Sequence, residues 1–117
     1  KLIAHGDNRP SALARMYTEM GGESLYFGKP HPPIYDLAYR RLDALDRDVP
    51  RGRILAIGDG AQTDIAGAMG EDIDSLFITG GLAAEATRTT DQPDEAALRA
   101  FLQAEKIAPR FAIGRLR

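Results

Sequence analysis

The chain of 117 residues contains no cysteine and no tryptophan, and its charge is nearly balanced, with 15 Lys and Arg against 17 Asp and Glu. The absence of cysteine excludes disulfides, zinc–thiolate sites and a cysteine nucleophile, and it is compatible with a reducing compartment, so we expect a cytoplasmic protein. The balanced charge offers no electrostatic footprint for a nucleic acid or an anionic membrane, and we expect neither as a partner. No apolar run approaches the roughly 18 residues that a transmembrane helix needs.

The residues that are present have the composition of a folded domain. Hydrophobic residues make up 44% of the chain and charged residues 27%, which is typical of a globular protein and disfavours intrinsic disorder. A chain of this length forms one domain or part of one. Because it begins with Lys1 rather than methionine, we expect it to be a piece of a longer protein.

Helical and extended patterns alternate along the chain. Apolar residues at helical spacing predict helices over 11–20, 34–45 and 93–102, a short helix from Thr63 or Asp64 to Met69, and a helical turn over 82–87. Short apolar runs predict strands over 24–27, 54–57, 75–79 and 111–113. The run 54–57 does not alternate, which is typical of a strand buried on both faces of a parallel sheet. The alternation of strands and helices predicts an α/β fold with a parallel sheet.

Two carboxylates follow the apolar strand 54–57 within the segment GDGAQTD. Asp59 comes where the strand ends, and Asp64 lies in the first turn of the helix that follows. Functional groups gather at the carboxyl ends of strands in such sheets, so we expect both carboxylates to face one space there. Two carboxylates that lie close together repel each other unless a cation lies between them. Oxygen ligands of this kind favour a hard divalent ion, and Mg²⁺ is the best fit.

A second segment, GKPHP, follows the predicted strand over 24–27. Lys29 stands between a glycine and a proline, and its ammonium group would be a good partner for a phosphate or a nucleophilic carboxylate near a metal site. His31 is a further candidate substrate contact. Each residue also has a plainer interpretation: Lys29 as a solvated lysine, His31 as a loop residue, Asp59 as a turn residue and Asp64 as an acid favoured by the helix dipole. The pair Gly80-Gly81 is most simply a turn from strand to helix.

The segments GKPHPPIYDLA and RILAIGDGAQTDIAGA resemble motifs III and IV of the haloacid dehalogenase (HAD) superfamily. They are most similar to its class IIA branch, the NagD-like and p-nitrophenyl-phosphatase-like hydrolases. The resemblance implies a Rossmann-like HAD core and a Mg²⁺-dependent phosphohydrolase. It implies that Lys29 steadies the nucleophile and the phosphoryl group, that Asp59 ligates Mg²⁺ directly, and that Asp64 completes the metal site directly or through water.

The resemblance also implies a division of the chain. Residues 1–27 would be the end of an α/β cap domain, and residues 28–117 the C-terminal half of the HAD-like core. Related hydrolases often pair through their caps, so the resemblance is also compatible with a homo-oligomer. In the family sheet, the strand matching 54–57 lies beside the first strand of the core, so this chain alone would leave an apolar strand with an open edge.

One family motif does not occur in the sequence. The nucleophile and general acid of the family lie in a DxDG(T/V) motif, which these 117 residues lack. The family reaction forms an aspartyl-phosphate and hydrolyses it. We therefore expect a longer parent protein that hydrolyses a small phosphorylated metabolite, and we expect these residues alone to be inactive. The alternative is a non-catalytic HAD-like module that binds Mg²⁺ or phosphate, or that serves in protein interaction.

Overall fold

The computed structural model describes residues 2–4, 24–26, 28–46 and 48–117, and the chain forms two compact units, Lys1–Val49 and Pro50–Arg117. The first unit holds two short parallel strands, β1 (Leu2–Ala4) and β2 (Ser24–Tyr26). The strand predicted over 24–27 is thus found, while Phe27 and the helix predicted over 11–20 lie outside the described residues. The assignment of residues 1–27 to a cap domain stays a prediction.

Helix α2 (Pro32–Leu45) of the first unit confirms the helix predicted from the spacing of its apolar residues. Prolines occupy its first two positions, where a missing backbone N–H costs no helical hydrogen bond. The helix ends at Asp46, whose backbone N–H still donates to the carbonyl of Leu42 at 2.8 Å.

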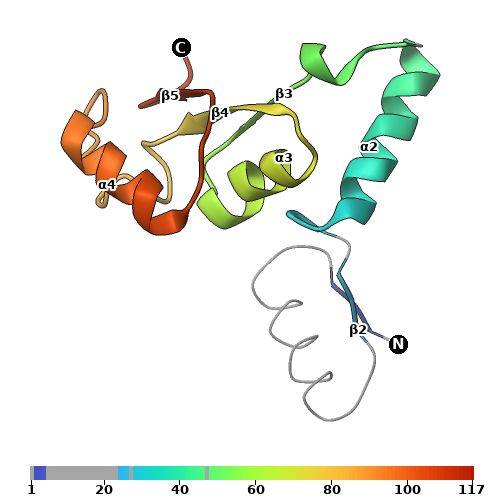
Figure 1. The fold of residues 1–117 in the computed structure, drawn as a ribbon, viewed down its shortest axis with the longest axis horizontal. Coiled ribbons are helices and arrows are strands. Elements are labelled where there is room, and N and C mark those ends of the chain that lie inside the picture. Colours follow the sequence, from blue (N-terminus) through green and yellow to red (C-terminus); the bar gives the residue numbers. More distant parts are fainter. Residues whose placement is uncertain (1, 5–23, 27, 47) are drawn as a thin grey trace. The chain divides into compact units, whose positions relative to one another are not determined.

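The second unit is built on a parallel sheet of three strands in the order β3 (Leu55–Gly58), β4 (Asp74–Ile78) and β5 (Phe111–Ile113). Figure 1 shows α3 (Ala66–Gly70) and α4 (Glu95–Glu105) on the same side of this sheet. The register pairs Gly58 with Phe77 and Phe77 with Ala112, so these three residues share one face. The predicted α/β fold with a parallel sheet is confirmed.

The segment after β3 begins its helical turns earlier than the sequence predicts. A single helical turn, Arg51–Arg53, precedes β3. After β3 the chain forms a wide turn of π-helix, Ala61–Ile65, which continues into α3. The N–H of Ile65 donates to the carbonyl of Gly60 at 3.0 Å, which closes this wide turn. A start at Thr63 or Asp64 is therefore wrong. Single turns of π-helix occur often at functional sites.

The core of the second unit lies between the sheet and α4. Ile65, Phe77, Ala83 and Ile107 are buried, and Leu98, Phe101 and Leu102 of α4 pack against them. The rings of Phe77 and Phe101 stack with centroids 5.8 Å apart. The helix predicted over 93–102 is confirmed, although it begins at Glu95 and ends at Glu105. The packing fixes it on the Phe77 face of the sheet.

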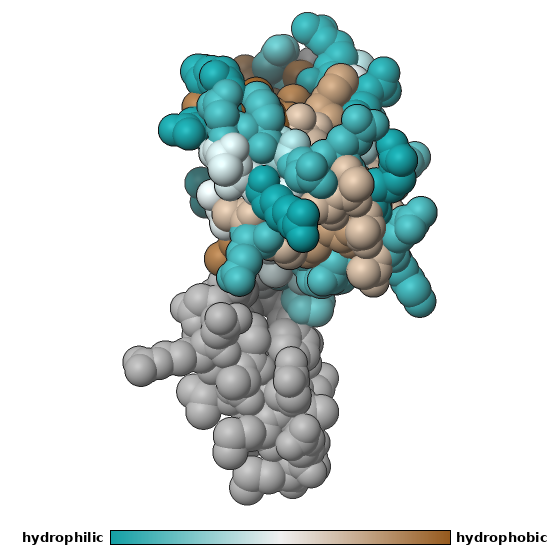
Figure 2. All heavy atoms as spheres, turned by 90° about the vertical axis from the view of Figure 1, so that its left-hand side faces the viewer, coloured by the Kyte–Doolittle hydropathy of each residue, from teal (hydrophilic) through white to brown (hydrophobic). Residues whose placement is uncertain are grey.

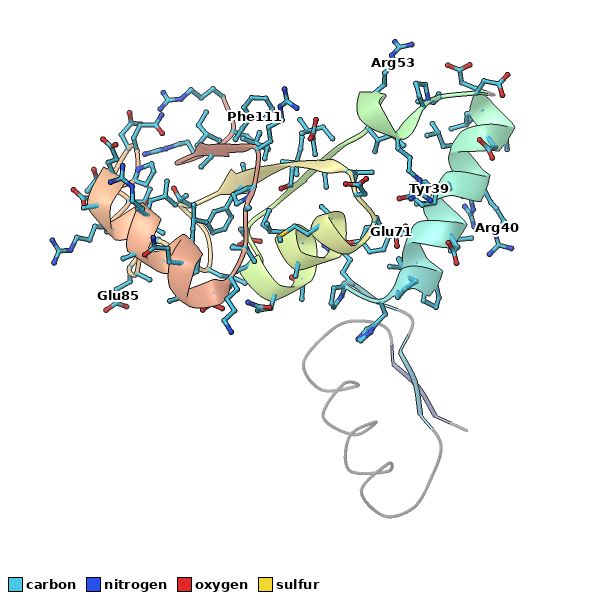
Figure 3. The ribbon with its side chains drawn as sticks, viewed as in Figure 1. Tyr39, Arg40, Arg53, Glu71, Glu85 and Phe111 are labelled. Carbon is cyan, nitrogen blue, oxygen red and sulfur yellow. The ribbon has the colours of Figure 1, made fainter. Side chains whose placement is uncertain are left out.

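Strand β3 corrects the expectation of a strand buried on both faces. Leu55 and Ile57 are 44% and 50% exposed. They point to the sheet face opposite Phe77, because side chains alternate along a strand. On the same face Phe111 is 52% exposed, and Figure 3 shows it on the side of the sheet away from α3 and α4. Within the described sheet, β3 is also an edge strand, as expected for this chain alone.

Helix α4 carries its polar residues outward. Asp94 caps its N-terminus by accepting the N–H of Ala97 at 2.9 Å, and Arg99 pairs with Glu95 one turn away. Figure 2 faces this side of the unit and shows hydrophilic residues with paler hydrophobic patches between them. In the described part of the chain, no helix is long and apolar enough to cross a membrane.

Candidate functional site

Asp59 lies at the carboxyl end of β3, directly after the strand. Its Oδ2 accepts a hydrogen bond from the backbone N–H of Leu82 at 3.1 Å. Leu82 follows β4 and is far from Asp59 in the sequence, so the carboxylate bridges the loops after two neighbouring strands. The bond holds one oxygen of Asp59 in a defined direction, while the carboxylate keeps its remaining lone pairs for a ligand.

Gly81 makes room for this carboxylate. A Cβ placed on Gly81 would lie 2.6 Å from the Cβ of Asp59 and 2.7 Å from its Cγ, and it would lie closer still to Oδ2. The φ angle of Gly81 is not in the left-handed region, so the requirement for glycine is a matter of space. Gly81 therefore does more than turn the chain, because it also makes room for the side chain of Asp59.

Asp64 lies in the π-helical turn and is buried, with 9% of its surface exposed. Its Oδ2 accepts the backbone N–H of Gly60 at 3.0 Å. A Cβ on Gly58 would lie 2.5 Å from the Cβ of Asp64, and a Cβ on Gly60 would lie 3.2 Å from its Oδ2. The two glycines around Asp59 thus leave the space into which the second carboxylate folds back.

Three threonine hydroxyls stabilise the loop that presents Leu82. The Oγ1 of Thr89 donates to that of Thr79 at 2.8 Å and lies 2.7 Å from the Oγ1 of Thr87. Thr87 also donates to the carbonyl of Ala83 at 2.8 Å, and both Thr79 and Thr87 are fully buried. Satisfied hydrogen bonds between buried groups rigidify a segment. The N–H of Leu82 is therefore presented to Asp59 from a loop tied to the end of β4.

A cavity of about 350 Å³ lies at the carboxyl edge of the sheet. We call it the edge cavity; its lining consists of Ile57, Gly58, Asp59, Ile78, Gly80, Gly81, Gly114, Arg115 and Leu116. Asp59 is the acidic residue of this lining and Arg115 the basic one. All the other lining residues are glycine or aliphatic, so the cavity combines an apolar wall with one group of each charge.

Lys29 and His31 belong to the first unit, on the segment between β2 and α2. Lys29 is exposed, and His31 is partly buried at the residue that precedes α2. The backbone N–H of His31 donates to the carbonyl of Gly28 at 2.9 Å, which closes a tight turn around Lys29. The structure places Asp59 and Asp64 on the segment that follows β3 in the second unit. That their carboxylates face one space, and that Lys29 and His31 reach it, stays a prediction.

The profile of the HAD-hydrolase-like family matches residues 26–104. The match contains Lys29, His31, Asp59 and Asp64. The chain belongs to the HAD-like hydrolases. No match was found among the curated proteins.

Solved structures of HAD proteins have the same fold. A haloacid dehalogenase-like hydrolase from Brucella suis 1330 is 37% identical, with a TM-score of 0.65 over 92% of this chain and 37% of that one. A "possible sugar phosphatase" of the HAD superfamily from Cytophaga hutchinsonii is 22% identical, with a TM-score of 0.62 over 89% of this chain and 33% of that one. A thermostable NPPase from Geobacillus stearothermophilus is 21% identical, with a TM-score of 0.56 over 80% of this chain and 40% of that one. The chain thus spans two fifths or less of these relatives.

The carboxylates of this HAD-like chain fit Mg²⁺ in number and kind. Mg²⁺ is commonly held by one or two protein carboxylates together with water and substrate phosphate. Asp59 and Asp64 supply two carboxylates on one loop, each with one oxygen hydrogen-bonded to a backbone N–H. Among the residues that the structure describes, no group of three or more His, Asp or Glu side chains gathers as a metal site. The carboxylates that the segment after β3 can offer are these two.

Sequence reasoning missed Gly81, Leu82 and Arg115. Gly81 and Leu82 reach Asp59 only because β3 and β4 are neighbours, and Arg115 reaches the edge cavity only because β5 follows β4 in the sheet. The signal available in the sequence was the Gly80-Gly81 pair at a strand end, and a turn explains that pair equally well.

Proposed function

We propose that this chain is the C-terminal part of a Mg²⁺-dependent phosphohydrolase that acts on a small phosphate ester. The observation that carries the proposal is the placement of Asp59 and Asp64 at the carboxyl end of β3 in a HAD-like hydrolase. Class IIA, with its NagD-like and p-nitrophenyl-phosphatase-like members, is the branch we favour. The NPPase and the sugar phosphatase that share the fold support this choice.

Asp59 and Asp64 would hold Mg²⁺, which would neutralise charge on the phosphoryl group when bound. Asp59 has the better access, since it is only half-buried and lines the edge cavity, whereas Asp64 is buried. We therefore assign direct ligation to Asp59, and to Asp64 either direct ligation or contact through water. The hydrogen bond from Leu82 keeps the Asp59 carboxylate oriented.

Lys29 would stabilise the charge of the phosphoryl group and of the attacking carboxylate, and His31 would contact the substrate. An ammonium group is a compact positive charge suited to phosphate oxygens. The hydrogen bond between His31 and Gly28 closes a turn around Lys29, and this turn restricts the backbone position from which the lysine side chain extends. The nucleophile of the aspartyl-phosphate reaction would come from residues outside these 117, because the sequence has no DxDG(T/V) motif. The 117 residues alone would then be inactive.

The test is a phosphatase assay on the full-length protein with p-nitrophenyl phosphate, with and without Mg²⁺, beside the variant Asp59→Asn. We expect Mg²⁺-dependent turnover by the full-length protein and a loss of about 100-fold or more in kcat/KM for the variant. Asp72→Asn is a matched control, because Asp72 is exposed and its positive φ of 56° suits asparagine. The control variant keeps its activity if the loss at Asp59 is specific.

Two outcomes would count against the proposal. Equal rates for Asp59→Asn and the unmodified protein would remove Asp59 from the metal site. No turnover of any phosphate ester, together with retained Mg²⁺ binding, would favour the non-catalytic module. A cytoplasmic location and independence from nucleic acids and membranes belong to the same proposal.

A further inference from the structure

Arg115 and Asp59 both line the edge cavity. Asp59 follows β3, and Arg115 follows β5, which is two strands away in the sheet. Strand β4 separates β3 from β5, so the ends of these strands are about 10 Å apart. Arg115 comes two residues after the end of β5. A small molecule held at Asp59 through its phosphoryl group can therefore extend along the edge of the sheet toward the guanidinium.

The backbone next to Arg115 is held on both sides. The carbonyl of Gly114 accepts the N–H of Gly80 at 2.8 Å, and the N–H of Gly114 donates to Oε1 of Gln92 at 3.0 Å. Gly114 is buried, and a Cβ on Gly80 would collide with its carbonyl oxygen. The backbone next to Arg115 is therefore held in place beside the Gly80-Gly81 turn, which also contacts Asp59.

The guanidinium of Arg115 is only weakly engaged by Asp91. Its Nη2 lies 3.9 Å from Oδ1 of Asp91, which is beyond hydrogen-bond distance. Arg117 holds the same carboxylate more closely, with Nη2 at 3.1 Å from both of its oxygens. The side chain of Arg115 is 67% exposed, so a ligand can reach it without breaking a buried ion pair. Arginine is suited to carboxylates and phosphates because its planar group donates two parallel hydrogen bonds.

We propose that Arg115 binds a second anionic group of the substrate, so that the preferred phosphate ester carries a carboxylate or a second phosphate beside the group that is hydrolysed. This inference rests on the function proposed above. The phosphoryl group would lie beside the Mg²⁺ that Asp59 would hold, and the second anion would lie at Arg115. The edge cavity is lined by both Asp59 and Arg115, and Ile57, Ile78 and Leu116 offer an apolar wall for the body of the ester.

The experiment measures kcat/KM of the full-length protein on two matched pairs of substrates. One pair is 3-phosphoglycerate and glycerol 3-phosphate, which differ in a carboxylate, and the other is fructose 1,6-bisphosphate and fructose 6-phosphate, which differ in a phosphate. We expect the unmodified protein to prefer the substrate with the second anion in at least one pair. We expect Arg115→Gln to reduce that preference about tenfold, and Arg115→Lys to keep part of it. The affected pair tells whether the second group is a carboxylate or a phosphate.

Arg99→Gln is the matched control, because it removes the same charge from an exposed site on α4, and we expect it to leave the preference unchanged. Calorimetric titration with the same four compounds gives a readout that does not depend on turnover. Turnover without a preference for the second anion, or a preference that Arg115→Gln leaves intact in both assays, overturns the inference alone. Absence of Mg²⁺-dependent turnover on every substrate, with the Arg115-dependent preference retained in calorimetry, overturns the phosphohydrolase and leaves the anion site standing.

Discussion

Gly81 lies against the carboxylate of Asp59, so closely that a single methyl group at this position would overlap with the Cβ and the Cγ of the aspartate. The next residue, Leu82, donates its backbone N–H to the same carboxylate at 3.1 Å. One turn after β4 therefore supplies both the space and the hydrogen bond that orient the side chain following β3. Two predictions test the contacts around Asp59 and Asp64, and a third tests the exposed strand β3.

The first concerns Gly81→Ala in the full-length protein. The added methyl group must displace Asp59, so we expect the Mg²⁺ concentration for half-maximal activity to rise about tenfold or more, as is typical when the support of a metal ligand is disturbed. Magnesium titrations of activity and calorimetry both measure this. Gly70→Ala is the control, because nothing lies within 4 Å of a Cβ at that position. Identical magnesium titrations for the two variants would contradict the role of Gly81.

The second concerns Gly58→Ala, which places a methyl group against Asp64. Since the nearest atoms include the Cβ of Asp64, rotation of the carboxylate alone cannot relieve the overlap. We expect the free energy of unfolding to fall by about 1–3 kcal/mol, the usual cost of overpacking. Urea unfolding monitored by circular dichroism measures it. Gly52→Ala has open space around its Cβ and should change stability by less than about 0.5 kcal/mol; a similar midpoint for both variants would refute the steric argument.

The third concerns the 117-residue chain expressed alone. Strand β3 is an edge of the described sheet, and it exposes Leu55 and Ile57, a combination that favours association with other chains. We expect this chain to form oligomers or aggregates in size-exclusion chromatography with light scattering. Ile57→Lys should increase the monomer fraction, whereas Leu82→Lys, at an exposed residue outside the strand, should not. A monomeric chain that unfolds cooperatively would show that the edge needs no partner.

The sequence predicts the order and type of elements well, because those depend on local spacing. Helix α4 is an example: the apolar spacing predicts Ala97, Leu98, Phe101 and Leu102 as its inner side, and the last three pack against the buried core around Phe77. The exposure of β3 could not be predicted, because an apolar run does not tell how many strands or helices cover it. The start of the π-helical turn at Ala61 also departs from the prediction, since the wide turn depends on the carbonyl of Gly60.

The candidate site was predictable only in part. The GDGAQTD segment predicts two carboxylates at the end of a strand, and the structure places Asp59 and Asp64 there. The contacts that orient Asp59 join residues more than 20 positions apart, which no local pattern reveals. Whether Lys29 reaches this site stays a prediction, because Lys29 lies in the other unit.

The pairing of β3 with β4 couples the stability of the second unit to the position of Asp59 relative to the turn after β4. The register that sets Gly58 opposite Phe77 also aligns Asp59 with the turn that contains Leu82. A slip by one residue would turn Phe77 out of the core and displace Asp59 along the edge by about 3.3 Å. Burial of the Phe77 ring therefore also stabilises the position of Asp59, and forms of the sheet with another register are less stable.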